Sequence, residues 1–153
     1  MKRTLWRRKP TKPLKRGKLK AKTGLKKQSK QKISVVQRKL WELCRQIIKQ
    51  RYGNKCYTCG SPNLVGANWQ VGHLWAKASL GAYLKYDLRV LSPQCFRCNI
   101  HLGGMGAEFY RRMFILEGQE YMEKLVADRQ VSVKAYDHYI SLIGNYEKLL
   151  KEK

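Results

Sequence analysis

Acidic side chains are absent from the first 41 positions of this 153-residue chain, and the first carboxylate is that of Glu42. Residues 1–32 contain fifteen Lys and Arg side chains and few apolar residues. Such a segment cannot bury enough apolar surface to offset the entropy lost on ordering, so the sequence predicts a disordered basic arm over residues 1–33. The folded domain is then expected over residues 34–153.

Long apolar runs are also absent. No stretch approaches the roughly 18 consecutive apolar residues of a membrane-spanning helix. The N-terminus also lacks the apolar stretch, about 7–15 residues long, that a secretory signal needs. We therefore expect neither a membrane partner nor export.

The chain has five cysteines, an odd number, so they cannot all pair in a disulfide framework. Four of them stand in metal-type spacing. The fifth, Cys44, falls within a helical pattern, where we expect a small buried side chain. This cysteine usage fits a reducing compartment, and we expect a cytoplasmic protein.

The formal charge of +23 and the isoelectric point near 10.1 indicate a partner that is a polyanion. Nucleic acid is the favoured interpretation, with DNA ahead of RNA. In the arm we expect phosphate contacts from Arg7, Arg8, Lys15 and Arg16, and a steep dependence of affinity on salt. The alternative interpretation is an arm that serves solubility or localisation.

Helical periodicity begins at Ser34. Apolar residues recur at three- and four-residue intervals from Val36 to Ile47, and Gly53 supplies a left-handed stop, so we expect a helix with Ser34 as its N-cap. The sequence further predicts two short strands, over 69–75 and 87–92, and three helices, over 107–118, 119–128 and 132–151. This mixture indicates an α+β fold with a thin core.

Two Cys-x-x-Cys pairs, separated by 35 residues, are the strongest chemical signal in the sequence. Each pair can grip a metal ion from a tight turn, and four thiolates complete a tetrahedral zinc site with Zn–S distances of about 2.3 Å. The sequence therefore predicts a structural Zn²⁺ held by Cys56, Cys59, Cys95 and Cys98. Because a closed site has no position for water, any catalysis must come from other residues.

Several motifs, taken in order, carry a resemblance to a known family. They are Lys55-Cys56-Tyr57-Thr58-Cys59-Gly60, Gly72-His73, Tyr86-Asp87-Leu88-Arg89 and Pro93-Gln94-Cys95-Phe96-Arg97-Cys98-Asn99. Over residues 38–126 the chain resembles the HNH nucleases with a treble-clef zinc site, and more narrowly the bacteriophage NinG (Rap) recombination proteins. The resemblance implies a zinc-bound ββα core with flanking helices, in a metal-dependent endonuclease that acts on branched DNA during phage recombination in the host cytoplasm.

The resemblance also implies roles for individual residues. His73 corresponds to the general base that takes a proton from the attacking water, a task that suits a neutral imidazole. Asn99 corresponds to a ligand of a catalytic Mg²⁺ or Mn²⁺, and His101 could assist as a ligand or a phosphate contact. Beside the arm, we expect four arginines to grip the DNA backbone, namely Arg89, Arg97, Arg111 and Arg112.

Each of these assignments has a structural alternative. His73 could be a buried residue bonded to a backbone carbonyl, and Asn99 could cap the helix after the second pair. Asp87 could orient the site, bind the metal or simply form a turn. His138, in the last predicted helix, is expected to be structural or exposed to solvent.

One departure from the family pattern bears on catalysis. The middle Asn of the HNH motif should stand nine residues before Asn99, where this chain has Val90. That Asn fixes the orientation of the histidine, and Gln94 or Asp87 are the residues that could replace it. The competing functions are a catalytically inactive zinc-containing protein that binds DNA or RNA, and an RNA-bound structural protein. A resolvase would be expected to act as a homodimer.

Overall fold

The computed structural model describes residues 20–152, with side chains from Lys32 onward. Arg7, Arg8, Lys15 and Arg16 lie outside the described residues. A boundary between Lys32 and Ile33 divides the chain into two units, and the folded elements other than the first half of α1 belong to the second unit.

Helix α1 (Lys20–Tyr52) begins fourteen residues before the predicted N-cap, so the expectation that Ser34 starts the helix is wrong. The predicted disordered arm therefore overlaps α1 from Lys20 to Ile33. Over residues 20–33 the chain has no proline and is rich in Lys, which has a high helix propensity. The high density of positive charge over these residues opposes this propensity.

A two-stranded antiparallel sheet lies at the centre of the fold. Strand β1 (Trp69–His73) pairs with β2 (Leu91–Cys95), in a register that places Trp69 opposite Cys95 and His73 opposite Leu91. The predicted second strand, 87–92, began too early. Asp87 accepts a hydrogen bond from the Arg89 backbone N–H at 2.9 Å, which forms a 3₁₀ turn, η3 (Leu88–Val90), before the strand.

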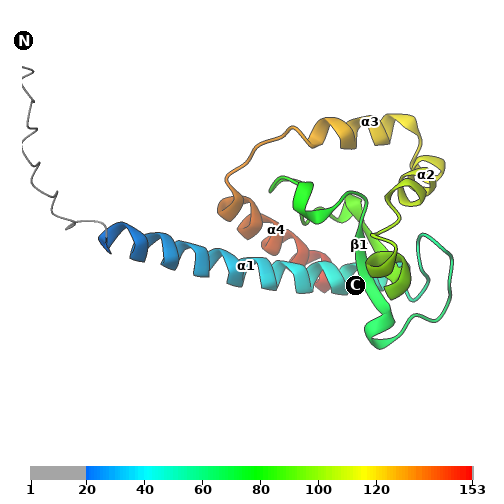
Figure 1. The fold of residues 1–153 in the computed structure, drawn as a ribbon, viewed down its shortest axis with the longest axis horizontal. Helices are drawn as coiled ribbons and strands as arrows, with labels where there is room; N and C mark the ends of the chain where they lie inside the picture. The colour runs from blue at the N-terminus through cyan, green and yellow to red at the C-terminus, as the bar shows by residue number, and fades with distance from the viewer. Residues whose placement is uncertain (1–19, 153) are drawn as a thin grey trace, which may run out of the picture. The chain divides into compact units, whose positions relative to one another are not determined.

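Three helices follow the sheet, as the sequence predicted. They are α2 (Gly106–Glu117), α3 (Gln119–Asp128) and α4 (Ala135–Lys151). Gly118 separates α2 from α3 with a φ of 86°, a conformation that glycine adopts without strain. The α+β prediction is confirmed at the level of helices combined with a small sheet (Figure 1).

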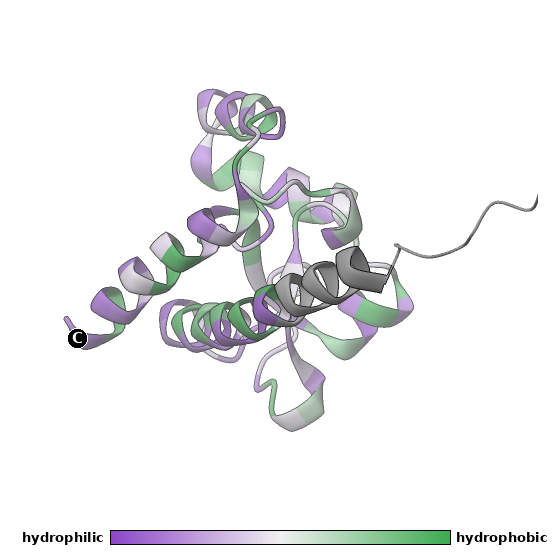
Figure 2. Cartoon of the chain, turned by 90° about the vertical axis from the view of Figure 1, so that its left-hand side faces the viewer, coloured by the Kyte–Doolittle hydropathy of each residue, from purple (hydrophilic) through white to green (hydrophobic). Residues whose placement is uncertain are grey.

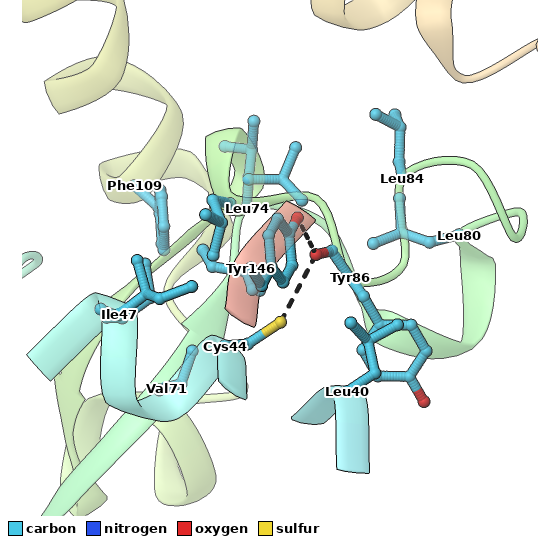
Figure 3. Packing of buried hydrophobic residues seen from close by; sticks show 14 of the residues in the cluster. Leu40, Cys44, Ile47, Val71, Leu74, Leu80, Leu84, Tyr86, Phe109 and Tyr146 are labelled. Carbon is cyan, nitrogen blue, oxygen red and sulfur yellow. Dashed lines mark hydrogen bonds between the residues drawn. The ribbon is translucent and has the colours of Figure 1, made fainter. Parts of the chain in front are cut away.

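The core forms where α1, the hairpin and α4 meet. The Tyr86 carbonyl accepts hydrogen bonds from the Tyr146 hydroxyl, at 2.9 Å, and from the Cys44 thiol, at 3.5 Å, and both side chains lie among buried Leu, Ile and Val residues (Figure 3). Cys44 is fully buried, as predicted, and burial raises the pKa of its thiol to about 12. One carbonyl thus joins α1 to α4 through the loop that connects the strands.

Apolar and polar residues alternate along α4, so this helix has one face for the core and one for solvent (Figure 2). Tyr139, Ile143 and Tyr146 are its buried residues. A salt bridge of 2.6 Å between Lys39 and Glu147 links α1 to α4 at the surface. Within residues 20–152, no helix combines the length and the apolar character needed to cross a bilayer.

The packing of α3 generates a test of the core. Leu125 is fully buried, whereas its neighbour Val126 is 45% exposed. We expect Leu125→Ala to lower the free energy of unfolding by about 2–5 kcal/mol, because it leaves a cavity, and Val126→Ala to change it by less than about 0.5 kcal/mol. Urea denaturation of the zinc-loaded protein measures both, and equal losses would contradict the described burial.

Candidate metal centre and histidine site

The first cysteine pair lies on a tight turn directly after α1. Gly60 donates its backbone N–H to the Cys56 carbonyl at 3.0 Å, and Cys56 donates its own to the Ser61 carbonyl at 2.8 Å. Gly60 has a φ of 75°, which permits the turn. The turn presents both thiols of the pair toward the end of the sheet.

The second pair begins on the last residue of β2. Cys95 ends the strand, and Cys98 lies one turn later in a π-helical segment, η4 (Arg97–His101). The Cys98 backbone N–H donates to the Cys95 sulfur at 3.4 Å, and the Cys95 N–H donates to the Cys56 sulfur at 3.3 Å. The second contact crosses directly from one pair to the other.

The four sulfur atoms form one cluster. All lie within 4.8 Å of one another, and the Sγ atoms of Cys59 and Cys95 are 3.9 Å apart. Four sulfurs at about 2.3 Å from a tetrahedral zinc ion would be about 3.8 Å apart, so the cluster fits that ion. The predicted site is confirmed to the extent that the cysteines gather in a group that could hold a structural metal such as zinc.

Hydrogen bonds at the cluster favour the thiolate form that a metal requires. Burial by itself would raise the pKa of Cys56, but the backbone N–H groups of Cys59 and Cys95 and the Thr58 hydroxyl lower it to about 6. In contrast, burial raises the pKa of Cys98 to about 12. A cation among the sulfurs is what would allow all four to be deprotonated together.

Gln94 braces the first cysteine turn from within the core. It is fully buried, and its Nε2 donates to the Thr58 hydroxyl at 3.2 Å and to the Gly104 carbonyl at 2.7 Å. The amide lies so close to β1 that a Cβ at Gly72 would fall 1.8 Å from Gln94 Oε1. The glycine before His73 is therefore a steric requirement of this brace.

His73 ends β1 at the other end of the hairpin. Its Nε2 lies 3.1 Å from the Lys85 carbonyl, and its ring stacks on Trp41 with 5.4 Å between centroids and 8° between planes. A carbonyl only accepts, so Nε2 must carry the proton. The neutral ring then has its lone pair on Nδ1.

The environment keeps this ring neutral. Burial is the largest cause that lowers the pKa of His73, from 6.5 to about 4, and the nearby charges of Lys77 and Lys85 lower it further, while the Lys85 carbonyl opposes them. The unfolded chain thus binds more protons between about pH 4 and 6.5. The contribution of His73 to stability is complete above this window and is lost as the pH falls through it.

Neither Asn99 nor His101 shares a contact with His73. Asn99 Nδ2 donates to Gln70 Oε1 at 3.0 Å, and the His101 ring meets the edge of Phe96 at 5.1 Å. Asn99 lies inside η4, so the alternative that it caps a helix is wrong. Within residues 20–152, the four cysteines are the only group of three or more His, Cys, Asp or Glu arranged to hold a metal.

The arginines predicted to grip DNA differ in their surroundings. Arg89 donates to Asp87 and, at 2.8 Å, to Asp128, so it ties η3 to α3. Arg111 and Arg112 both pair with Glu108 on α2, and Arg97 is exposed on η4. Their contacts with a DNA backbone stay a prediction.

The remaining polar candidates have structural partners. Asp87 forms the turn described above, which is one of its predicted roles. His138 Nε2 lies 3.2 Å from the Tyr83 carbonyl, and its ring stacks on Tyr83, so its predicted structural role is confirmed.

Sequence reasoning missed the two partners that orient His73. Lys85 acts through its backbone carbonyl, which leaves no trace in the sequence. Trp41 lies 32 residues earlier, beside the buried Leu40 in the helical pattern, and only its size and position next to the apolar stripe could have indicated it.

Zinc binding can be tested with the fifth cysteine as a control. We expect about one zinc ion per chain in the wild type and in Cys44→Ala, because Cys44 lies outside the cluster. Cys98→Ser should lose the ion and most of its cooperative unfolding transition. Metal analysis and thermal circular dichroism measure both effects. A Cys98→Ser chain that keeps zinc and folds normally would contradict the assignment.

The state of His73 can be measured directly. We expect NMR of ¹⁵N-labelled protein to show the Nε2–H tautomer and no titration of this ring between about pH 5 and 8, because burial opposes its charge. The chain has three histidines, so comparison with His73→Ala identifies the signal. A ring that titrates near pH 6.5, or that carries its proton on Nδ1, would rule out the described hydrogen bond.

Comparison with known proteins gives a family assignment. The family model of the bacteriophage lambda NinG protein matches residues 1–153, the full length of the chain. No curated protein and no solved structure matches the chain. The narrower of the two resemblances seen in the sequence is confirmed by this match: the chain belongs to the family of the bacteriophage lambda NinG protein.

Proposed function

We propose that this protein is a DNA endonuclease of the HNH type, in which a zinc-braced hairpin presents His73 as the general base. The observation that carries the proposal is the placement of His73, which is held by the Lys85 carbonyl and the Trp41 ring. This arrangement fixes a neutral imidazole with Nδ1 free of the proton. Nδ1 could take a proton from water while the water oxygen bonds to phosphorus and the bond to the leaving oxygen breaks.

The same contacts explain how the site could work without the motif Asn. Val90 is fully buried and offers no hydrogen bond from its side chain. The two residues expected to replace the Asn are engaged elsewhere, since Gln94 bonds to Thr58 and Gly104 while Asp87 bonds to Arg89. The Lys85 carbonyl performs the orienting task that the Asn performs in other HNH sites.

Positive charge is available close to His73. The Lys77 ammonium lies 4.3 Å from the centroid of the Trp41 ring on which His73 stacks, and 5.1 Å from that of Tyr86. Burial lowers the pKa of Lys77. We infer that Lys77 binds a phosphate oxygen of the DNA strand near His73.

A catalytic Mg²⁺ or Mn²⁺ is part of the HNH proposal, but the described residues offer it few ligands. Asn99 and His101 have separate partners, and no second group of three ligands accompanies the cysteines within residues 20–152. Mg²⁺ often relies on one or two protein ligands together with substrate phosphates. The nicking assay therefore compares Mg²⁺, Mn²⁺ and no added ion.

Family membership favours DNA as the substrate, and branched recombination intermediates in particular. The net charge of +23 supports a nucleic-acid substrate independently of the family. Cleavage on both sides of a branch would need a homodimer, since paired cuts need paired sites.

A second candidate function is a zinc-structured protein that binds DNA or RNA without cutting it. The replacement of a polar motif residue by the fully buried Val90, and the separation of Asn99 and His101 from His73, favour this candidate. Both candidates make the same use of the zinc cluster and differ only in the role of His73.

Nicking assays separate the two candidates. Zinc-loaded protein is incubated with a four-way junction, a duplex and a single strand, with Mg²⁺, with Mn²⁺ or with no added ion. We expect the wild type to nick DNA. His73→Ala should lower the nicking rate by about 10²- to 10⁴-fold, because the variant lacks the general base. Its affinity for DNA should be unchanged.

His138→Ala is the matched control, because His138 also bonds to a backbone carbonyl and stacks on an aromatic ring. It should nick at close to the wild-type rate. Tight binding without nicking under every metal condition would reject the endonuclease and establish the second candidate.

A further inference from the structure

A hollow beside the first cysteine turn is lined by Cys56 and by two of the arginines considered above, Arg111 and Arg112. It has a volume of about 440 Å³ and is formed by the end of α1, the first cysteine turn, Pro93 of β2 and one face of α2. This volume falls within the range of small-ligand sites in proteins. Its lining includes none of His73, Asn99 and His101.

Aromatic and apolar side chains form the walls. Tyr52 is 46% exposed at the end of α1, and Tyr57 packs on Phe109 with 4.7 Å between ring centroids. Ile115 and Leu116 complete the apolar part and are 64% and 68% exposed. A large exposed ring next to exposed aliphatic groups, in a hydrophilic protein, indicates a surface that meets an apolar or aromatic ligand.

Cations surround these walls. Lys55, Arg111 and Arg112 line the same hollow, and Glu108 is the carboxylate that pairs with both arginines, so the rim keeps an excess of positive charge. A smaller hollow of about 120 Å³ shares Tyr52, Tyr57 and Leu116 with the first and continues to Arg51 and Arg89. Glu117 also lines this smaller hollow, and Arg89 is already paired with Asp87 and Asp128, so the positive charge available beyond the tyrosine pair is that of Arg51.

We propose that this groove binds unpaired nucleotides of a nucleic-acid strand, with a base stacked on Tyr52 and the flanking phosphates at Lys55 with Arg111 on one side and Arg51 on the other. The sequence of cation, aromatic ring and cation follows the alternation of phosphate, base and phosphate along a strand. Stacking on aromatic rings in a basic groove is the general means of binding single strands.

The proposal deepens the proposed function, because it names unpaired nucleotides as the part of the DNA that the protein selects. Bases within an intact duplex are stacked on each other and cannot reach Tyr52, whereas the strands at a branch, flap or gap can supply an open base. The choice of DNA as the ligand rests on the proposed function. The test does not, because it measures binding and not cleavage.

The experiment measures the affinity of the full-length, zinc-loaded chain for fluorescently labelled DNA by anisotropy. One probe is an oligothymidine of about 15 nucleotides and the other is a blunt duplex of the same length. No Mg²⁺ or Mn²⁺ is added, and salt is held near 200 mM so that phosphate contacts outside the groove weaken. We expect Tyr52→Ala to weaken binding of the single strand at least about fivefold, because stacking on the ring is lost.

Two variants serve as controls. Tyr52→Phe keeps the ring and should bind the single strand like the wild type. Tyr136→Ala removes a tyrosine that is also 46% exposed but lies on α4, outside the groove, and should change neither affinity. Because Tyr52 is exposed, its replacement is expected to leave the thermal transition unchanged, and circular dichroism checks this.

The comparison of probes decides the result. If Tyr52→Ala weakens binding of the single strand but not of the duplex, the proposal is supported. This holds even if the protein nicks no DNA in any assay. An unchanged affinity overturns it, and so does an equal loss for the duplex, since that would show a backbone contact without stacking. If His73→Ala abolishes nicking while single-strand binding depends on Tyr52, both the proposed function and this groove are supported separately.

Discussion

Contact between the two cysteine turns is the constraint on which the rest of the structure depends. A hairpin of two five-residue strands is marginal in water by itself. The sulfur cluster anchors the end of β2 to the turn that follows α1, and the Cys95 N–H bonds to the Cys56 sulfur across the junction. From this anchor, the register of β1 on β2 places His73 opposite Leu91 at the other end of the hairpin.

Polar groups inside the fold serve the same anchor. The Gln94 amide donates hydrogen bonds to Thr58, between the first two cysteines, and to Gly104, before α2. The Tyr86 carbonyl receives Cys44 from α1 and Tyr146 from α4. Both cases join segments that are far apart in the sequence by buried hydrogen bonds, which are costly to leave unmade. A small core thereby obtains a single arrangement of its helices.

Local signals in the sequence were enough to predict the cysteine cluster, α2, α3, α4 and the burial of Cys44, because spacing, glycines and periodicity are properties of short segments. The start of α1 was missed, since helix propensity and charge repulsion oppose each other over residues 20–33 and their balance is not visible locally. The orientation of His73 was also out of reach. It depends on the backbone carbonyl of Lys85 and on a ring from α1, and neither forms a pattern with His73 along the chain.

These contacts also explain why a valine fits at position 90, where the HNH pattern would have Asn. Val90 is part of the core, and its backbone carbonyl accepts the Leu74 N–H at 2.9 Å, next to His73. A polar side chain there would need a buried partner, whereas valine needs none. Because the Lys85 carbonyl already fixes the tautomer of His73, the core can gain an apolar residue at position 90 without releasing the ring. Valine at position 90 is therefore compatible with a histidine held neutral, with its proton on Nε2.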